Sequence, residues 1–384
     1  MIYHILPEME PFCDSRGGAI SKNVANIMHF DGSRVVVCQN ADDSWGYSAD
    51  RIVVIDALRH YAKVKGRRNL PLWVTGPFFR HAFKPLIQRL NPGDLVWCHN
   101  QPFFAAALEE NIRAKDARLV YHCHDPIAPP AVRAAFRSFK ADAYVYVSEA
   151  LRQRWLTLFP GLTNTYVVHN GADDKRFYPI PKAPSQDSIP VILYVGRIHP
   201  EKGVHFLVEA IRILERRSVA VHCRVVGSSF SGGSKKTRYV KDLIRNSPRS
   251  IEFRGYRAAR SIAEEFQQAD ICCCPSVYLE AFGNVNIEAM ACGVPVVATR
   301  VGGIPEIASD GGVLLVDPGS AEQIADALES LVRDRTLRQR VAAEGLASYR
   351  RRFTWAVAVE HYAHIAASLT NTDLHYATLT AVGG

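Results

Sequence analysis

The stretch Tyr194-Val-Gly-Arg-Ile-His-Pro-Glu-Lys-Gly203 begins as an apolar strand, turns at Gly196 and leads into a segment of helical period. Two cations, Arg197 and Lys202, stand in the turn. Ligands of open α/β sheets bind where strands end, and the N–H groups at the start of a helix favour anions. The stretch therefore predicts a parallel α/β sheet with a place for a diphosphate at its edge. Taken alone, it is equally typical of a solvated basic turn.

Outward from this stretch, short apolar runs alternate with segments of helical period. Runs such as Arg34 to Cys38 are rich in β-branched or aromatic residues and nearly continuous in apolar character, which is typical of strands buried on both faces of a parallel sheet. The expected strands are 3–6, 34–38, 95–98, 119–123, 144–147, 166–168, 192–195, 221–226, 251–253, 271–274, 294–298 and 313–316. The expected helices include 19–29, 78–90, 103–114, 131–141, 149–158 and 204–214. This alternation predicts doubly wound α/β sheets.

The two series of strands are separated by residues 179–190, which contain four prolines. Proline cannot donate to a β-ladder, so this segment is expected to be a linker. A chain of 384 residues also exceeds what one core usually organises. We expect a Rossmann-like domain over 1–180, a second over 181–352, and a C-terminal helical segment with a frayed tail over 353–384.

Composition restricts the class of protein. The content of 48% hydrophobic and 22% charged residues is typical of a globular protein in water. The formal net charge of +8 attracts phosphates, whether of nucleotides, nucleic acid or anionic lipid. No apolar run reaches the ~18 residues of a membrane span, and Met1 to Leu6 resembles a strand rather than a leader. We therefore expect a cytoplasmic protein.

Cysteine and histidine spacing argues against a metal centre. The nine cysteines contain no C-x-x-C pair and stand mostly in apolar runs, where cysteine is a small buried hydrophobe. In Tyr121-His-Cys-His-Asp125 only His122 and His124 share a strand face, and zinc needs more ligands than two. One of these histidines could hydrogen-bond a substrate hydroxyl, although a lone histidine is more often structural.

Two carboxylates stand eight residues apart in Glu280-Ala-Phe-Gly-Asn-Val-Asn-Ile-Glu288. A helix is expected to begin near Gly283, which leaves Glu280 in the preceding loop and Glu288 more than one turn into the helix. A carboxylate accepts hydrogen bonds from two hydroxyls, so the pair could grip two parts of one ligand. A helix cap followed by an exposed glutamate is an equally ordinary explanation.

Paired glycines occur in Asp14-Ser-Arg-Gly-Gly-Ala19 after the first strand. They would let the backbone approach a ligand closely, and an ordinary tight turn explains them as well. The segment lacks a full G-x-G-x-x-G, which disfavours dinucleotide binding.

In this order the segments resemble glycosyltransferase family 4, whose members have the GT-B fold of two Rossmann-like domains facing across a cleft. The resemblance covers most of the chain and is strongest from 191 to 318. It is carried by Tyr194 to Gly203, by the E-x7-E spacing of Glu280 to Glu288, and by Val301-Gly-Gly-Ile-Pro-Glu306. Val147-Ser-Glu149, His169-Asn-Gly-Ala-Asp173 and Arg16-Gly-Gly-Ala19 match landmarks of the N-terminal domain.

The resemblance implies roles for matching residues. The donor diphosphate would be held by Gly196, Arg197 and Lys202, with Gly17 and Gly18 nearby on the opposite domain. Glu288 would take the ribose hydroxyls, and Gly227, Arg254 and Tyr256 would frame the base. Glu280, with the backbone of Phe282, Gly283, Asn284 and Val285, would orient the transferred sugar. His124 would lie beside that sugar, with His122 as the alternative register. His124, Glu280, Arg197 and Lys202 would thus be the catalytic residues.

The resemblance also implies the reaction: retaining transfer of a hexosyl or N-acetylhexosaminyl unit, without a metal or other cofactor, from a nucleotide sugar to a hydroxyl. UDP is the commonest donor nucleotide in the family, and the sequence contains no D-x-D. The acceptor would be a glycan, a glycolipid or a small molecule. Asn284, Asn286 and His199 depart from the family pattern and could tune the donor. Family members often return their last helix, here Trp355 to Leu369, to the N-terminal domain.

Other interpretations stay open. A sugar-nucleotide epimerase or a phosphorylase would use a similar fold, and the +8 charge allows a non-catalytic nucleotide or nucleic-acid binder. The aromatic and basic interleaving of single-strand platforms is not evident, which disfavours nucleic acid. His99-Asn-Gln-Pro102 is the candidate acceptor contact. Residues 131–140 combine basic and apolar side chains, which suits an anionic membrane at the inner face or an ordinary surface helix.

Overall fold

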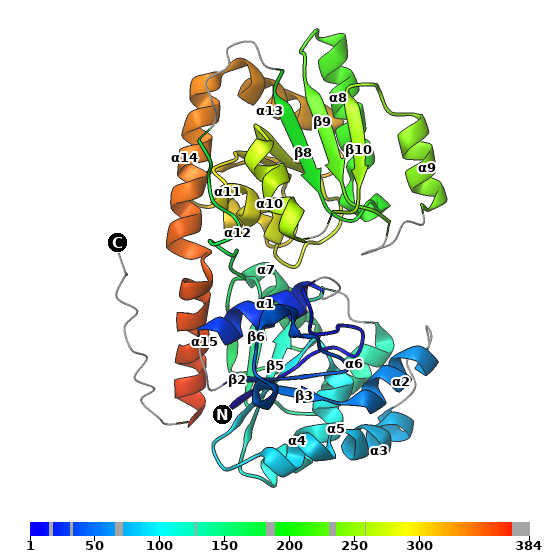
Figure 1. The fold of residues 1–384 in the computed structure, drawn as a ribbon, viewed down its shortest axis with the longest axis vertical. Helices are drawn as coiled ribbons and strands as arrows, with labels where there is room; N and C mark the ends of the chain where they lie inside the picture. The colour runs from blue at the N-terminus through cyan, green and yellow to red at the C-terminus, as the bar shows by residue number, and fades with distance from the viewer. Residues whose placement is uncertain are drawn as a thin grey trace.

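A computed structural model describes residues 1–14, 18–30, 34–65, 72–126, 129–181, 189–229, 236–257 and 259–370. The chain forms two lobes, each built on a parallel β-sheet flanked by helices (Figure 1). The seven strands of the N-terminal sheet have the order β3-β2-β1-β4-β5-β6-β7, and the six of the C-terminal sheet the order β10-β9-β8-β11-β12-β13. The two parallel sheets confirm the fold class expected from the sequence.

The strands are short and lie mostly where the apolar runs predict them. They are Ile2–Ile5 (β1), Arg34–Cys38 (β2), Ile52–Val54 (β3), Leu95–His99 (β4), Arg118–Cys123 (β5), Ala143–Tyr146 (β6), Thr165–Val167 (β7), Val191–Val195 (β8), His222–Val226 (β9), Ile251–Gly255 (β10), Ile271–Cys274 (β11), Val296–Thr299 (β12) and Val313–Val316 (β13).

Helices connect the strands. They are Ala19–His29 (α1), Asp56–Lys65 (α2), Leu72–Ala82 (α3), Lys84–Arg89 (α4), Pro102–Arg113 (α5), Pro130–Arg137 (α6), Glu149–Leu158 (α7), Val204–Arg216 (α8), Arg238–Arg245 (α9), Ala259–Gln268 (α10), Asn284–Ala291 (α11), Ile304–Ala308 (α12), Ala321–Arg333 (α13), Arg335–Arg352 (α14) and Trp355–Thr370 (α15). In α8 the apolar residues recur every three or four positions, and those that face the sheet are buried.

Two expectations about elements are wrong. Strand β3 was not predicted, although Ile52 to Ile55 form an apolar run as long as others that were; it is a three-residue edge strand whose Val54 is exposed. The single helix expected over 78–90 is divided into α3 and α4. Pro85 has no N–H to give to the preceding turn, so a new helix begins there, with the proline in its first turn.

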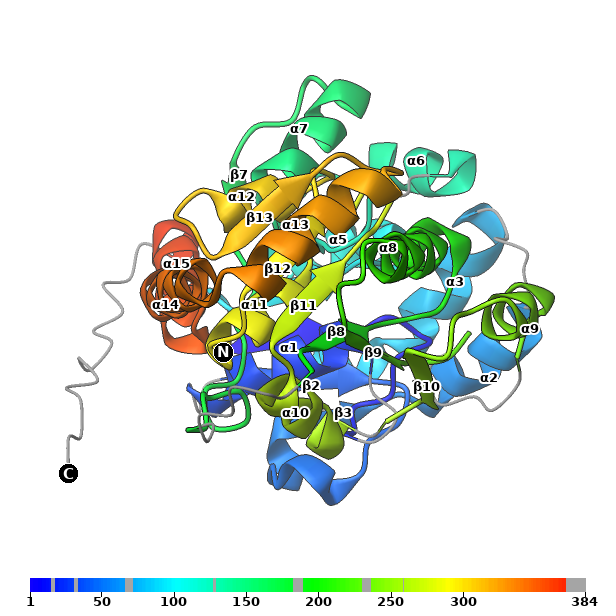
Figure 2. The same cartoon turned by 90° about the horizontal axis from the view of Figure 1, so that it is seen from above.

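The C-terminal helices run along one side of both lobes (Figure 1). Helix α14 packs on α11 of the C-terminal lobe, and α15 packs on the N-terminal sheet, where Tyr362 meets Trp97 edge to face at 5.3 Å. The view from above shows the strap that α14 and α15 form at the edge of both lobes (Figure 2). Within the described residues, no helix is both long enough and apolar enough to cross a bilayer.

Candidate active site

A cavity of about 580 Å³ lies between the lobes. It opens at the carboxyl ends of strands β1 and β4 in one sheet and of β8 and β11 in the other. At both places the connections that follow two neighbouring strands run in opposite directions along the sheet. Open α/β sheets bind ligands at such switch points. The candidate residues that line it are Gly18, His124, Gly196, Arg197, Lys202, Glu280, Phe282, Gly283, Asn284 and Val285.

The basic turn after β8 supplies two cations to this cavity. Arg197 is exposed there and forms no ion pair with a described residue. The amine of Lys202 donates to Oε1 of Glu280 at 2.5 Å, and the Ser276 hydroxyl donates to the same oxygen at 2.6 Å. Glu280 is therefore held in a fixed orientation, and the ammonium of Lys202 keeps two further N–H donors.

Glycine is required beside this turn by close packing. A Cβ on Gly227 would lie 1.8 Å from the carbonyl oxygen of Gly196, and Gly227 has a φ of 142°. Only glycine therefore lets the ends of β8 and β9 approach this closely. A second, small cavity of about 130 Å³ shares Gly196 and Arg197 with the main cavity, and Gly227 and Tyr256 also line it.

Glu288 lies in a third cavity of about 310 Å³, which adjoins the first through Gly18 and Asn284. Tyr256 and Arg176 also line it. Burial raises the pKa of Glu288 from its ordinary value of 4.5 to about 7, against the opposing effect of Lys22 and Arg176. The two glutamates of the E-x7-E spacing thus line neighbouring cavities.

Some candidate residues lie elsewhere. The guanidinium of Arg254 pairs with Glu265 at 2.9 Å and with Glu252 at 3.1 Å, and it lines none of the three cavities. Gly17 lies outside the described residues.

The two asparagines of the E-x7-E segment line the main cavity and are hydrogen-bonded within the protein. The amide of Asn284 accepts from Asn170 of the opposite lobe at 2.9 Å. The amide of Asn286 donates to the carbonyl of Gly283 at 3.0 Å.

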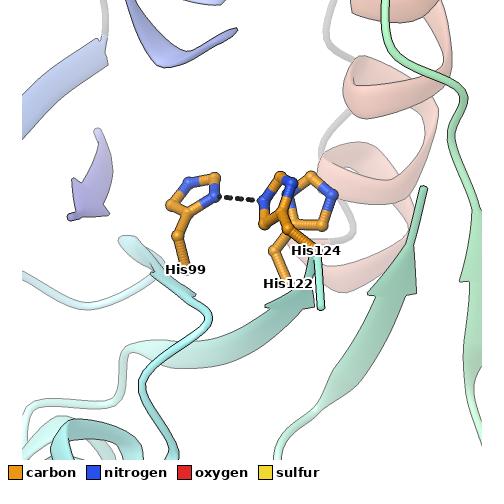
Figure 3. Close-up of side chains that lie close together, drawn as sticks. All are labelled: His99, His122 and His124. Atoms are coloured by element: carbon orange, nitrogen blue, oxygen red, sulfur yellow. Dashed lines mark hydrogen bonds between the residues drawn. The ribbon is translucent and has the colours of Figure 1, made fainter. Parts of the chain in front are cut away.

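The structure distinguishes the two histidines that the sequence left as alternatives. His124 lines the main cavity, whereas His122 is fully buried. Burial lowers the pKa of His124 to about 3, so its imidazole is neutral. A third histidine, His99 of the neighbouring strand, lies beside them (Figure 3). Counting only two histidines on this face was therefore wrong, because the third comes from another strand.

The sequence also gave no sign of Glu10 as a cleft residue. Its carboxylate accepts from the backbone N–H of Ser21 at 2.8 Å, at the start of α1, and it lies in the main cavity. Burial raises its pKa, and hydrogen bonds from backbone N–H groups oppose this. Gly18 lies so close that an added Cβ would be 2.6 Å from the Glu10 carboxyl carbon. Asn100, from the segment expected to contact the acceptor, and Asn170, from the segment His169 to Asp173, also line this cavity.

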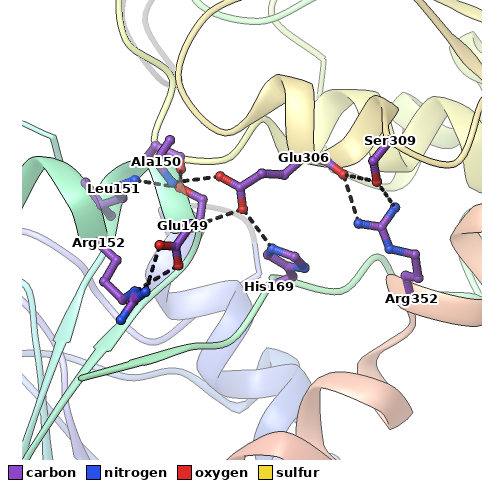
Figure 4. A network of polar contacts seen from close by, with 10 residues as sticks. Glu149, Ala150, Leu151, Arg152, His169, Glu306, Ser309 and Arg352 are labelled. Carbon is purple, nitrogen blue, oxygen red and sulfur yellow. Dashed lines mark hydrogen bonds and ion pairs between the residues drawn. The ribbon is translucent and has the colours of Figure 1, made fainter. Parts of the chain in front are cut away.

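A polar network joins the two lobes (Figure 4). Glu306 of α12 accepts hydrogen bonds from the backbone N–H groups of Glu149 at 2.8 Å and Ala150 at 2.7 Å, at the start of α7. His169 lies 3.1 Å from the same carboxylate. The hydroxyl of Ser148 donates to the carbonyl of Ala281 at 2.5 Å. The loop that carries Glu280 is thus anchored to the N-terminal lobe.

Basic residues of 131–140 do not share an exposed face with the aromatic ones. Phe136 and Phe139 are buried and pack on Tyr121.

All nine cysteines are free and buried, which confirms their expected role as small apolar residues.

Two family models match the chain. Residues 28–176 match the model described as Glycosyltransferase Family 4, and residues 180–347 match the model described as Glycosyl transferases group 1. Together they cover most of the sequence.

Among curated proteins, the chain is similar to alpha-maltose-1-phosphate synthase of Mycolicibacterium smegmatis, with 32% identity over 56% of this chain and 60% of that protein. It is also similar to D-inositol 3-phosphate glycosyltransferase of Corynebacterium jeikeium, with 38% identity over 50% of this chain and 49% of that protein. The matches thus span only about half to three fifths of these relatives.

Solved structures share the whole fold. HepE of Anabaena, in complex with UDP and glucose, superposes with a TM-score of 0.72 at 20% identity, over 96% of this chain and 99% of that chain. Sucrose-phosphate synthase of Thermosynechococcus elongatus superposes with a TM-score of 0.76 at 21% identity, with the same coverage of each chain. With these matches along the sequence and the two facing sheets, the chain belongs to glycosyltransferase family 4.

Proposed function

We propose that this chain is a retaining, metal-independent glycosyltransferase that moves a hexosyl or N-acetylhexosaminyl unit from a UDP-sugar to a hydroxyl group. One observation carries the proposal: a single cleft is lined by two cations of one lobe, by a carboxylate that one of these cations holds in place, and by a neutral histidine of the other lobe. Glu288, in the adjoining cavity, suits the ribose.

The chemistry follows from where charge develops. When the bond between the anomeric carbon and the phosphate breaks, negative charge grows on the departing diphosphate. Arg197 and Lys202 stabilise this charge, and one cation at ~4 Å with an effective dielectric constant of ~20 contributes up to about 4 kcal/mol. This corresponds to nearly three orders of magnitude in rate if it is realised only in the transition state.

In this proposal the acceptor hydroxyl attacks the anomeric carbon from the same face that the diphosphate leaves, so the anomeric configuration is retained. A phosphate oxygen then takes the proton of the acceptor hydroxyl, and no carboxylate nucleophile is needed. Glu280 is already engaged by Lys202 and Ser276, which suits a group that orients sugar hydroxyls rather than one that attacks carbon. Metal independence would appear as a transfer rate that EDTA leaves unchanged.

The donor nucleotide is proposed as UDP because the fold neighbour HepE binds it and the family uses it most. The acceptor is proposed to be a glycan, glycolipid or small molecule bound on the N-terminal lobe near Asn100, which lines the cleft. Contact with an anionic membrane would depend on basic side chains such as Arg133, since the aromatic residues beside them are buried.

The test is calorimetric titration of the protein with UDP, GDP and ADP. We expect micromolar binding of UDP and loss of that binding in Glu288→Ala. The exposed Glu322 of α13 provides the control Glu322→Ala, which should bind as the wild type does. Tight binding of GDP or ADP alone would reassign the base, and binding of none would reject the transferase proposal in favour of a phosphorylase or a non-catalytic protein.

A further inference from the structure

A line of hydrogen bonds crosses the N-terminal sheet and ends in the cleft. Nη1 of Arg34 lies 3.2 Å from Nε2 of His4, and Nδ1 of His4 lies 3.0 Å from Nε2 of His99. Nδ1 of His99 lies 3.0 Å from Nε2 of His124. Arg34, His4 and His99 are buried, and only His124 reaches the cavity.

The parallel register explains why these side chains meet. Arg34 pairs with Ile2, His4 with Trp97, and His99 with His122, in the successive strands β2, β1, β4 and β5. Since alternate residues of a strand share a face, all four side chains lie on the same side of the sheet. The line advances toward the carboxyl ends as it crosses from β2 to β5.

Donor counting gives the line a direction. A guanidinium group has N–H donors only, so Nε2 of His4 must accept. A neutral imidazole carries one N–H, so the hydrogen of His4 is on Nδ1 and faces Nε2 of His99, which must accept in turn. The same step places the hydrogen of His99 on Nδ1, facing Nε2 of His124. Burial lowers the pKa of all three imidazoles, which keeps them neutral.

We propose that Arg34, acting through His4 and His99, holds His124 in the tautomer that carries its hydrogen on Nδ1, so that His124 can only donate to a ligand in the cleft. Nδ1 of His124 forms no hydrogen bond with a described residue, so it is the nitrogen left for the ligand. Arg34, His4 and His99 are positioning residues. That the ligand atom is an oxygen of the transferred sugar rests on the proposed function.

A metal ion is the competing occupant of this place. Nitrogens of His99, His122 and His124 all lie within 4.8 Å of one another (Figure 3), and neither ring nitrogen of His122 has a hydrogen-bond partner among the described residues. Nε2 of His99 faces His4, so His99 would have to bind the metal through Nδ1, and its hydrogen would move to Nε2. Nδ1 of His4 would then have to accept that hydrogen bond, which moves the hydrogen of His4 to its own Nε2. There it would face the N–H of Arg34, so two donors would meet. The donor-only arginine therefore opposes a metal.

The deciding experiment is long-range ¹H–¹⁵N correlation of protein with ¹⁵N-labelled histidine at neutral pH, with resonances assigned by single His→Asn variants. We expect hydrogen on Nδ1 of His4, His99 and His124. Hydrogen on Nε2 of His99 or His124 would overturn the proposal. So would stoichiometric Zn²⁺ binding that shifts both resonances. The spectrum needs no donor, so a protein with these tautomers that transferred no sugar would reject only the proposed function.

A matched pair of variants tests the role of Arg34. Lysine also has donors only, whereas methionine has the same reach without a donor. Arg34→Lys should keep the His124 tautomer, and Arg34→Met should give a mixture of both tautomers and at least a fivefold lower transfer rate. An unchanged His124 spectrum in a folded Arg34→Met protein would remove Arg34 from the relay. Should the methionine variant not fold, the wild-type spectrum still decides the tautomers.

Discussion

At the scale of the residue, Glu288 combines a position in a cavity with an energetic cost. It lies in a cavity with Arg176, yet burial still raises its pKa to about 7. A carboxylate of this kind is partly protonated near neutral pH in the empty protein. A ligand that presents two hydroxyl donors stabilises the ionised form.

The first prediction is therefore a pH-dependent affinity. Between pH 6 and pH 8 the wild-type protein should bind its nucleotide more tightly as the pH rises, because the ionised carboxylate accepts both ribose hydroxyls. Glu288→Gln should bind more weakly and without this dependence. Calorimetry in two buffers of different ionisation enthalpy measures both the affinity and the protons released. A pH-independent wild-type Kd would show that Glu288 does not meet the ribose.

The same group predicts a pH effect on stability. The folded protein holds the Glu288 proton more tightly than the unfolded chain does, so this residue's contribution to stability is lost as the pH rises from about 4.5 to about 7. The difference in unfolding free energy between Glu288→Gln and the wild type should grow over this window. Urea unfolding at pH 5 and pH 8 measures it. An equal difference at both pH values would contradict the raised pKa.

A further prediction at the residue scale concerns the contribution of Lys202 to the rate. Lys202→Met removes a cation that is proposed to stabilise the diphosphate, and it leaves Glu280 with only the Ser276 hydroxyl on that oxygen. We expect kcat to fall by about two to three orders of magnitude. The exposed Lys241 of α9 provides the control Lys241→Met, which should keep the wild-type rate in a steady-state assay. A loss of less than tenfold in Lys202→Met would assign the diphosphate to other groups.

At the scale of the element, helix α7 is capped twice. Ser148 of its own chain segment accepts from the N–H of Leu151, and Glu306 of the other lobe accepts from two further N–H groups. The pKa of Glu306 is lower than its ordinary value. Burial alone would raise this pKa, but the hydrogen bonds from His169 and from these N–H groups lower it by more than burial raises it. A negative charge at a helix N-terminus is favourable.

Glu306→Gln tests this cap. The amide loses the charge and turns an N–H toward a backbone N–H, so unfolding free energy should fall by about 2–3 kcal/mol, as for a charged hydrogen bond. Glu360→Gln on the exposed face of α15 is the matched control and should change stability little. Denaturant unfolding of the three proteins decides. Equal midpoints for Glu306→Gln and the wild type would mean that water replaces the cap.

At the scale of the whole molecule, the chain crosses between the lobes twice, and the crossings meet. The N–H of Ala172 donates to the carbonyl of Phe353 at 2.9 Å, and the Tyr349 hydroxyl donates to the carbonyl of Ala172 at 3.1 Å. Gly171 lies against the backbone of Trp355. Here α14 ends on one lobe and α15 begins on the other, so this contact sets their relative position.

Gly171→Ala tests the crossing. An added Cβ would lie 2.6 Å from the backbone nitrogen of Trp355, so α15 must shift, and we expect a loss of about 1–3 kcal/mol in unfolding free energy. Gly161→Ala is the control, since nothing lies within 4 Å of its Cβ. Urea unfolding gives the stability and small-angle scattering the arrangement of the lobes. Equal stability of the two variants would show that the crossing yields without cost.

Local pattern accounts for how much could be predicted. The alternation of apolar runs and helical segments predicted twelve strands close to their observed places, and the glycines and cations of the β8 turn marked one side of the cleft. The E-x7-E spacing predicted the start of α11 because a helix beginning at Asn284 follows from nearby residues alone. What failed, β3 and the α3–α4 break, depends on an edge pairing and on one proline.

Sequence by itself therefore determined the two parallel sheets and the order of their elements, because each rests on periods and turns within about twenty residues. The resemblance to the family rested on the order of motifs along most of the chain. Only the tertiary structure decided that His124 and not His122 faces the cleft, that His99 joins them, and that Arg254 turns to Glu265. These contacts join strands and lobes far apart in the chain. Their physical cause is sheet register and the packing of the lobes, which no local spacing encodes.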